Sequence, residues 1–273
     1  MDLSVSWTHT NYFDLPLMKM CWKHFCSSQS ELQLFTSSPL KGFNAELSGF
    51  PKVDVLVDNQ LTVRKDLWKT SEKTRCKIVW APHFNMLDGM NGTFHENYRW
   101  FLQYAKDHPE ISWIVRPHPR MEWGVLQKKL FSSAEEYHQY LADWDNLPNA
   151  RVIPDGEYYD IFATSDAMIL DSVSFTAEYQ YTGNPMLILL PEHPRQMSQL
   201  GNAIVSASYC VRGNDHSGIE SFIRRDIPED SRKILRKDMF HDHMDTRRIT
   251  GLSATEYIMH TIKTELSAPI HPD

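Results

Sequence analysis

Five short, largely apolar segments alternate with longer segments of helical character, and this alternation constrains the fold more than any other feature of the chain. The apolar segments span residues 77–81, 112–116, 150–153, 167–170 and 185–190. Strands without a polar face are buried on both sides, which is typical of a parallel sheet covered by helices. The sequence therefore predicts an α/β fold with a Rossmann-like, doubly wound parallel sheet.

Helical spacing of apolar residues fills the intervals between these strands and continues after the last one. The predicted helices span residues 97–107, parts of 122–144, 158–164, 174–181, 219–225 and 255–266. The first fifty residues are mixed, with an amphipathic segment around residues 15–25 that indicates a helix.

Composition excludes several classes of protein. Hydrophobic residues make up 41% of the 273 residues and charged residues 23%, which argues against extended disorder. The 28 Lys and Arg against 35 Asp and Glu give a net charge of −7, which disfavours a nucleic-acid partner. No apolar run is long enough to span a bilayer and the first residues do not resemble a secretory signal, so we expect a cytoplasmic protein. Its four cysteines form no CxxC pair and are expected to be reduced thiols.

Chemistry is expected where the predicted strands end, because ligands of open parallel sheets bind at the carboxyl ends of the strands. The first predicted strand is followed by His83, the second by Arg116 and His118, and the third by Asp155. The fourth is followed by Asp171, Ser172 and Ser174, and the fifth by His193 and Arg195. Arginine, histidine and hydroxyl groups beside a helix start favour a phosphorylated ligand.

Structural uses of the same residues compete with this interpretation. His118 lies between two prolines and would rigidify a turn, while Ser172 or Ser174 would cap a helix. Asp171 would cap that helix or pair with an arginine. His193 and Arg195 are expected at the surface, and Glu178, one turn into the helix, would face solvent or a ligand hydroxyl.

Other motifs are missing or unconvincing. The sequence has no GxGxxG, no P-loop and no GxSxG elbow. The acidic and histidine-rich string at residues 241–245 has neither the helical i, i+4 spacing nor the finger spacing of metal ligands, so we interpret it as a solvated loop. No metal site and no cofactor is predicted.

Several strings, in their order along the chain, resemble the CDP-glycerol glycerophosphotransferase family of teichoic-acid primases and polymerases. The family's G-[YF]-P-x-x-D is similar to residues 49–54, its A-P-[TH] to 81–83, and its R-x-H-P to 116–119. Its S-D-x-x-[IL]-x-D-x-S-S resembles residues 165–174, and the segments at 183–185 and 200–202 follow in order. The likeness covers roughly residues 49–205.

The resemblance implies a GT-B glycosyltransferase-like architecture, with residues 76–273 as a Rossmann-like donor-binding domain. His118 and His83 would be catalytic, and Arg116, Ser172, Ser174 and Asp171 would bind the donor phosphates. Asp155, Glu178 and Asn202 would contact the nucleotide or polyol. A CDP-alcohol would be the donor substrate, with no cofactor.

Two departures from the family pattern affect these roles. The usual D-Y-S-S is Asp171-Ser172-Val173-Ser174 here, so one serine is displaced. The family's N-terminal W-H-G-T-x-x-K motif, whose His is the expected base, has no counterpart with a His; the nearest string is residues 35–41. Residues 1–75 are therefore interpreted as a shortened remnant of the acceptor-side half.

The resulting hypothesis is an EC 2.7.8 type transferase of cell-surface polysaccharide or teichoic-acid synthesis. It would move glycerol phosphate, or a similar polyol phosphate, from a CDP-activated donor to a glycan or lipid-linked acceptor and release CMP. Under this hypothesis we expect the protein either to associate peripherally with the inner face of the membrane or to bind a partner subunit that supplies the acceptor side. The alternatives are a nucleotide-sugar glycosyltransferase or epimerase of GT-B type, and a non-catalytic donor-binding module.

Overall fold

A computed structural model gives the fold and describes residues 13, 15–38, 42–58, 60–87, 92–193 and 197–267. The chain separates into two compact units. The larger comprises residues 61–196 and 204–236, and the smaller comprises residues 1–60, 197–203 and 237–273. No helix of the described residues combines the length and apolarity needed to cross a membrane.

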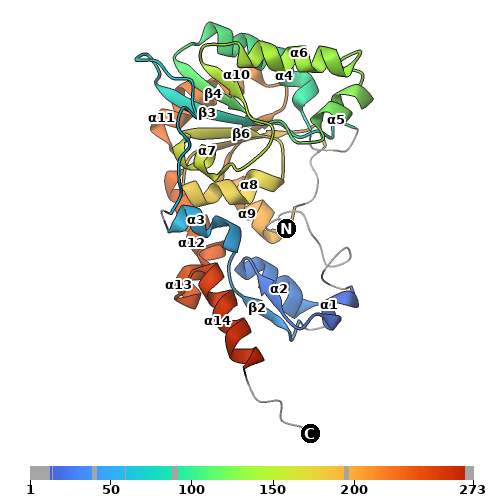
Figure 1. Ribbon diagram of the computed structural model, residues 1–273, viewed down its shortest axis with the longest axis vertical. Helices are drawn as coiled ribbons and strands as arrows, with labels where there is room; N and C mark the ends of the chain where they lie inside the picture. Colours follow the sequence, from blue (N-terminus) through green and yellow to red (C-terminus); the bar gives the residue numbers. More distant parts are fainter. Residues whose placement is uncertain are drawn as a thin grey trace. The chain divides into compact units, whose positions relative to one another are not determined.

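A six-stranded parallel sheet forms the centre of the larger unit (Figure 1). Its strands are β3 (Cys76–Ala81), β4 (Ile111–Val115), β5 (Ala150–Val152), β6 (Ala167–Leu170), β7 (Met186–Leu190) and β8 (Tyr209–Arg212). The spatial order is β5-β4-β3-β6-β7-β8. This is the doubly wound order in which the first strand of the sheet lies at its centre, so the predicted α/β class is confirmed.

Helices cover both faces of this sheet, with α4 and α6 on one side and α7 and α8 on the other (Figure 1). The helices that follow its strands are α4 (Phe94–Asp107), α5 (Met121–Gln127), α6 (Ala134–Asp145), α7 (Tyr159–Thr164), α8 (Ser174–Glu178), α9 (Gln199–Ala207), α10 (His216–Ser221) and α11 (Ile227–Glu229). A 3₁₀ turn at Tyr179–Thr182 follows α8, and a π-helix at Phe222–Asp226 follows α10.

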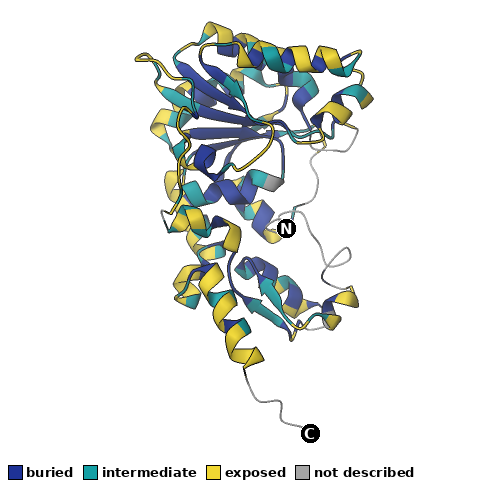
Figure 2. Ribbon diagram, viewed as in Figure 1, coloured by how far each residue is buried: buried dark blue, intermediate teal, exposed yellow. Residues whose placement is uncertain are grey.

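Alternate strand residues pack into different layers, as the continuous apolar pattern requires. Ile78 and Trp80 of β3 join the core beneath α4, which buries Phe94 and Phe101 at helical spacing. Val79, between them on the strand, is fully buried as well. Figure 2 shows the central strands of the large sheet mostly buried, while the helices expose their outer faces.

The smaller unit holds a two-stranded parallel sheet in a βαβ arrangement. The elements are α1 (Leu17–Met20), β1 (His24–Cys26), α2 (Gln29–Ser37), β2 (Ala45–Leu47), a 3₁₀ turn (Pro51–Val53) and α3 (Asp54–Val57), then α13 (Thr246–Thr250) and α14 (Ala254–Leu266). Helix α12 (Lys233–His243) and helix α9 each contribute residues to both units.

Two local predictions were wrong. The segment 15–25 forms only a one-turn helix, because the chain turns at residues 21–23 and then pairs with β2 from His24 onward. Residues 241–243 form the last turn of α12 rather than a loop. Short strands and helix ends depend on tertiary partners that periodicity does not reveal.

Candidate functional site

The strand order places the switch point of the larger unit between β3 and β6. Ala81 of β3 pairs with Leu170 of β6, so the chain leaves both strands side by side, at Pro82 and at Asp171. Ligands of open α/β sheets bind where strand order reverses in this way. The loops that begin at residues 82 and 171 therefore form the centre of the candidate site.

Asp171, at the start of the loop after β6, forms hydrogen bonds with the loop after β3. Its carboxylate accepts hydrogen bonds from the His83 backbone N–H at 2.5 Å, and from the backbone N–H and the hydroxyl of Thr93 at 2.5 and 2.9 Å. The side chain is fully buried, and burial raises the pKa of Asp171 to about 6 although these three donors oppose the shift. The Asp171 carboxylate thus sets the path of the loop between β3 and α4.

Two imidazoles meet beside Asp171. The rings of His83 and His118 lie 5.4 Å apart between centroids, at 67° to one another. The backbone N–H of His118 donates to the carbonyl of Pro82 at 3.2 Å, which joins the loop after β4 to the loop after β3. The two catalytic candidates, which are distant in the sequence, are thus neighbours.

His118 has a defined protonation and tautomer. Its Nδ1 accepts a hydrogen bond from the Arg120 backbone N–H at 3.0 Å, so the proton of the neutral ring lies on Nε2. Burial, aided by the charge of Arg120, lowers the pKa of His118. A neutral imidazole with an Nε2–H donor is suited to contacting a phosphate oxygen.

An aromatic cluster flanks the two histidines. The ring of Phe84 lies 4.5 Å from that of His118, and the Arg120 guanidinium lies 4.7 Å from Phe84 and 4.9 Å from Trp123. Trp123, in α5, keeps 43% of its surface exposed. Gly124 permits the approach of α5, because a Cβ there would lie 2.0 Å from the Phe84 carbonyl oxygen.

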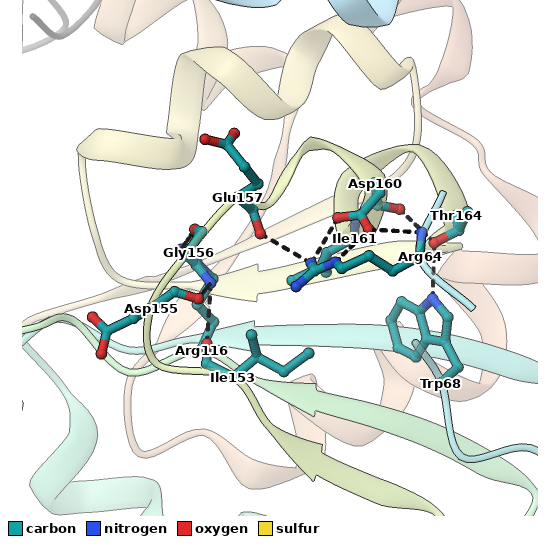
Figure 3. Close-up of polar contacts among 10 residues, drawn as sticks. All are labelled: Arg64, Trp68, Arg116, Ile153, Asp155, Gly156, Glu157, Asp160, Ile161 and Thr164. Carbon is teal, nitrogen blue, oxygen red and sulfur yellow. Dashed lines mark hydrogen bonds and ion pairs between the residues drawn. The ribbon is translucent and has the colours of Figure 1, made fainter. Parts of the chain in front are cut away.

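Arg116 holds the loop that follows β5 (Figure 3). Its guanidinium donates to the carbonyls of Ile153 at 3.1 Å, Asp155 at 3.3 Å and Gly156 at 2.7 Å, and it lies 4.9 Å from the ring of Tyr158. The side chain is 7% exposed. These contacts fix the backbone beside Asp155, whose own side chain is exposed.

Arg64 completes the restraint of this loop and was not identified from the sequence. Its guanidinium forms a bidentate pair with Asp160 at 2.6 and 2.7 Å and donates to the carbonyl of Glu157 at 2.9 Å (Figure 3). Trp68 in the same segment donates to the hydroxyl of Thr164 at 2.8 Å. The extended segment 61–69 therefore anchors α7, although its charged sequence carries no periodic signal for this role.

The segment that opens α8 contains the two predicted phosphate-binding serines. Ser172 is buried, and its carbonyl accepts a hydrogen bond from the Thr176 hydroxyl at 2.5 Å. Ser174 is the first residue of α8, and its side chain lies outside the described part of the chain. Ser172 follows Asp171 directly and Ser174 comes three residues after it, so both belong to the segment that leaves β6 at the switch point.

Glu178 is buried rather than solvated. Its Oε2 accepts hydrogen bonds from the hydroxyls of Tyr158 at 2.7 Å and Tyr159 at 2.8 Å. Burial, together with the Glu178 charge, raises the pKa of both tyrosines, so they remain neutral donors. This network joins the start of α7 to the end of α8.

The remaining predicted residues lie elsewhere. Asn202 belongs to the smaller unit, in α9, where its exposed side chain donates to the carbonyl of Met197 at 3.4 Å. His193 is exposed, as predicted, and Arg195 lies outside the described residues. Within the described ranges, no cluster of three or more His, Cys, Asp or Glu side chains could hold a metal ion.

Comparison with known proteins bears on the fold. No protein-family model matches the chain, and no curated protein matches it. A structure of the wall teichoic acid polymerase TagF has a TM-score of 0.65 at 12% identity and covers 99% of this chain and 68% of that chain.

Two epimerase-related structures resemble the chain to a similar degree. The co-structure of S. aureus MnaA with UDP has a TM-score of 0.60 at 10% identity, covering 99% of this chain and 70% of that one. The UDP-GlcNAc 2-epimerase from Neisseria meningitidis bound to UDP-GlcNAc has a TM-score of 0.57 at 14% identity, covering 97% and 68%. At such identities these likenesses establish a GT-B-like fold and no particular activity.

Proposed function

We propose that the chain transfers glycerol phosphate, or a similar polyol phosphate, from a CDP-activated donor to a hydroxyl of a glycan or lipid-linked acceptor and releases CMP. The observation that carries this proposal is the pair of imidazoles, His83 and His118, at the switch point of the six-stranded sheet. The ordered family motifs and the fold shared with TagF support it further.

The chemistry assigns a role to each of these side chains. The acceptor oxygen forms a bond to the outer phosphorus of the donor diphosphate, the bond from that phosphorus to the bridging oxygen breaks, and CMP leaves. His83 accepts the acceptor proton at Nδ1, which gives up the hydrogen bond that it accepts from the Asn85 backbone N–H at 3.3 Å, and the Nε2–H of His118 donates to the diphosphate. Catalysis of this kind depends on positioning and on stabilising charge on the phosphoryl oxygens, which fixed donors supply.

The other predicted residues support the donor in this proposal. Ser172, Ser174 and Asp171 line the phosphate side, with Asp171 acting through the loop that it holds. Arg116 acts through the loop at 153–156, because its guanidinium donates to carbonyls of that loop. Asp155 and Glu178 are assigned to the nucleotide and polyol side.

The proposal also assigns parts of the chain to donor and acceptor. Residues 76–273 would bind the donor, and residues 1–75 would be the remnant of an acceptor-side half. A partner subunit or the membrane surface at the cytoplasmic side would then present the acceptor, and no nucleic acid or metal would take part. The non-catalytic alternative is a donor-binding module that turns over only with such a partner.

A nucleotide-sugar glycosyltransferase or epimerase is the second candidate. It is favoured by the fold shared with MnaA in its UDP co-structure and with the UDP-GlcNAc 2-epimerase, because those TM-scores approach that of TagF. The donors of the two candidate functions differ in their nucleobase, cytosine or uracil, and in the group that is transferred. Binding of one nucleotide donor rather than the other therefore distinguishes the two functions.

A donor panel tests both candidates. We expect CDP-glycerol to raise the melting temperature more than UDP-GlcNAc, because a ligand that binds only the folded state stabilises it. CMP release should be lost in His118→Ala and retained in His193→Ala, a control at an exposed histidine. Stabilisation by UDP-GlcNAc alone would favour the second candidate, and CDP-glycerol binding without CMP release would favour the partner-dependent module.

A further inference from the structure

A large cavity lies in the six-stranded unit at the amino ends of the strands, whereas the switch point lies at their carboxyl ends. It has a volume of about 720 Å³ and is lined by the first residues of β3 and β4 and by the residues that precede β6 and β7. These lining residues include Cys76 at the start of β3, Ile111 at the start of β4 and Pro185 just before β7. A volume of this size accommodates a small organic molecule. Because the candidate donor site lies at the carboxyl ends of the same strands, this cavity is separate from it.

The outer wall of the cavity has an unusual backbone. Ile223 and Arg224 belong to the π-helix at Phe222–Asp226, and Ile227 and Pro228 follow it in the wall. Asp230, which ends α11, has a left-handed backbone with φ of 42°. Helices with one extra residue per turn occur often at functional sites, because the extra residue redirects side chains.

The charged groups around the cavity are not equally engaged. Two of the three acidic side chains have partners: Asp166 accepts from the Lys77 backbone N–H at 2.8 Å, and Glu110 contacts His108 at 3.1 Å. Among the basic ones, Arg75 and Lys233 form neither an ion pair nor a side-chain hydrogen bond with a described residue. Two cationic groups are therefore available to a ligand.

Asp230 adds an unsatisfied acceptor. Its Oδ2 accepts from Arg236 at 2.6 Å, whereas its buried Oδ1 has no hydrogen-bond partner among the described residues. Leaving a buried oxygen without a hydrogen bond is unfavourable, so Oδ1 of Asp230 is expected to meet a donor when the cavity is filled.

We infer that this cavity binds a small organic anion, a carboxylate or phosphate on an apolar skeleton that also carries a hydrogen-bond donor. Arg75 and Lys233 bind the anionic group, since both side chains are exposed at the same cavity without a hydrogen bond or ion pair to a described residue, and Arg75 interacts with Glu110 only through its charge. The apolar skeleton packs on Ile111, Ile223 and Pro185. The donor group of the ligand satisfies Oδ1 of Asp230.

Anilinonaphthalene sulfonate is a suitable probe, because it combines an anion, apolar rings and one N–H donor.

Alkylation of Cys76 reports whether the cavity is occupied. Cys76 lines the cavity, and burial raises the pKa of its thiol to about 12. Cys210 lies outside the cavity lining and its pKa is raised by burial to about 11, which makes it an internal control. Both thiols therefore react slowly with maleimide, and their rates are read by mass spectrometry of the full chain.

We expect saturating probe to slow the alkylation of Cys76 while leaving that of Cys210 unchanged. The double variant Arg75→Ala/Lys233→Ala should bind the probe at least about tenfold more weakly, as the loss of charged hydrogen bonds predicts. The double variant Arg99→Ala/Lys106→Ala removes the same charge from α4 outside the cavity and should bind normally. Thermal unfolding of each variant verifies that it is folded.

Competition then separates the ligand classes. 4-Hydroxyphenyl phosphate and 4-hydroxybenzoate, which carry the same phenol donor, are titrated against the bound probe, with inorganic phosphate as an anion that lacks a skeleton. Preferential displacement by one of the two organic anions identifies the anionic group. Equal protection of both cysteines, no protection of Cys76, or equal probe affinity in the two double variants would each overturn the inference.

Discussion

Asp171 shows how one residue sets the geometry of the switch point. A buried carboxylate is expensive to ionise, yet its three donors come from the two positions that define the β3–α4 loop, His83 and Thr93. The energetic balance is visible in its pKa of about 6, well above the value of 3.8 for a free side chain. Loop placement and proton binding are thus linked at a single side chain.

This linkage predicts how stability depends on pH. The folded-state pKa of Asp171 exceeds the unfolded-state value, so the folded protein binds the extra proton and gains stability as pH falls through about 6. Between pH 7 and pH 4 the gain from this one group is about 2 kcal/mol. In Asp171→Asn this contribution should vanish, which urea unfolding at a series of pH values measures. The exposed Asp155→Asn serves as control, and an unchanged pH profile in Asp171→Asn would contradict the assignment.

Sequence reasoning identified the residues that follow strands, because position along a parallel sheet determines which end they occupy. His83, His118 and Asp171 lie together for that reason. It did not identify Thr93 or Arg64, whose roles depend on contacts across 78 and 96 residues. It also did not anticipate that the Arg116 guanidinium donates to three carbonyls of one loop, since charge alone does not reveal a partner.

At the scale of elements, β3, β4, β6 and β7 could be predicted because each is apolar on at least three consecutive residues, and β5 was predicted although Arg151 interrupts it. β8 was missed, since Tyr209–Arg212 mixes apolar with polar residues at the sheet edge. β1 and β2 were missed because three-residue strands carry no periodicity. The π-helix was also missed, because it arises from packing and has no local sequence signal.

The approach of α5 to the β3–α4 loop makes Gly124 a critical position. In Gly124→Ala the new Cβ would overlap the Phe84 carbonyl, so backbone must move and stability should fall by about 1–3 kcal/mol. Because Phe84 lies between Gly124 and His118, the imidazole NMR signals of His83 and His118 should shift. Gly183→Ala strains the backbone at φ of 71°, but its Cβ meets nothing within 4 Å, so it should leave those signals unchanged. Unshifted signals in Gly124→Ala would mean that α5 does not position the pair.

At the scale of the whole molecule, the smaller unit is assembled from distant parts of the chain. Asp54 accepts from the backbone N–H groups of Ala254 at 3.2 Å and Thr255 at 2.7 Å, and so caps the start of α14. Gly49, with φ of 91°, lies so close to Thr246 that a Cβ would be 2.3 Å from its hydroxyl. The segment that resembles the family's G-[YF]-P-x-x-D therefore packs against the C-terminal helices. Its glycine allows close contact with Thr246, and its aspartate caps α14.

This assembly predicts which part of the chain unfolds when its C-terminal region is removed. Ending the chain at Arg236 deletes most of α12 and all of α13 and α14, with the buried side chains of Met244 and Ala254, so β1 and β2 should lose amide protection. The strands β3, β4, β6 and β7 should keep theirs, because their core lies within residues 61–236. Hydrogen exchange read by mass spectrometry measures both regions in one experiment. A chain ending at Ser267, which keeps both helices, should protect all of these strands. Simultaneous loss of protection in β1 and β3 after truncation at Arg236 would instead mean that the two units fold as one cooperative structure.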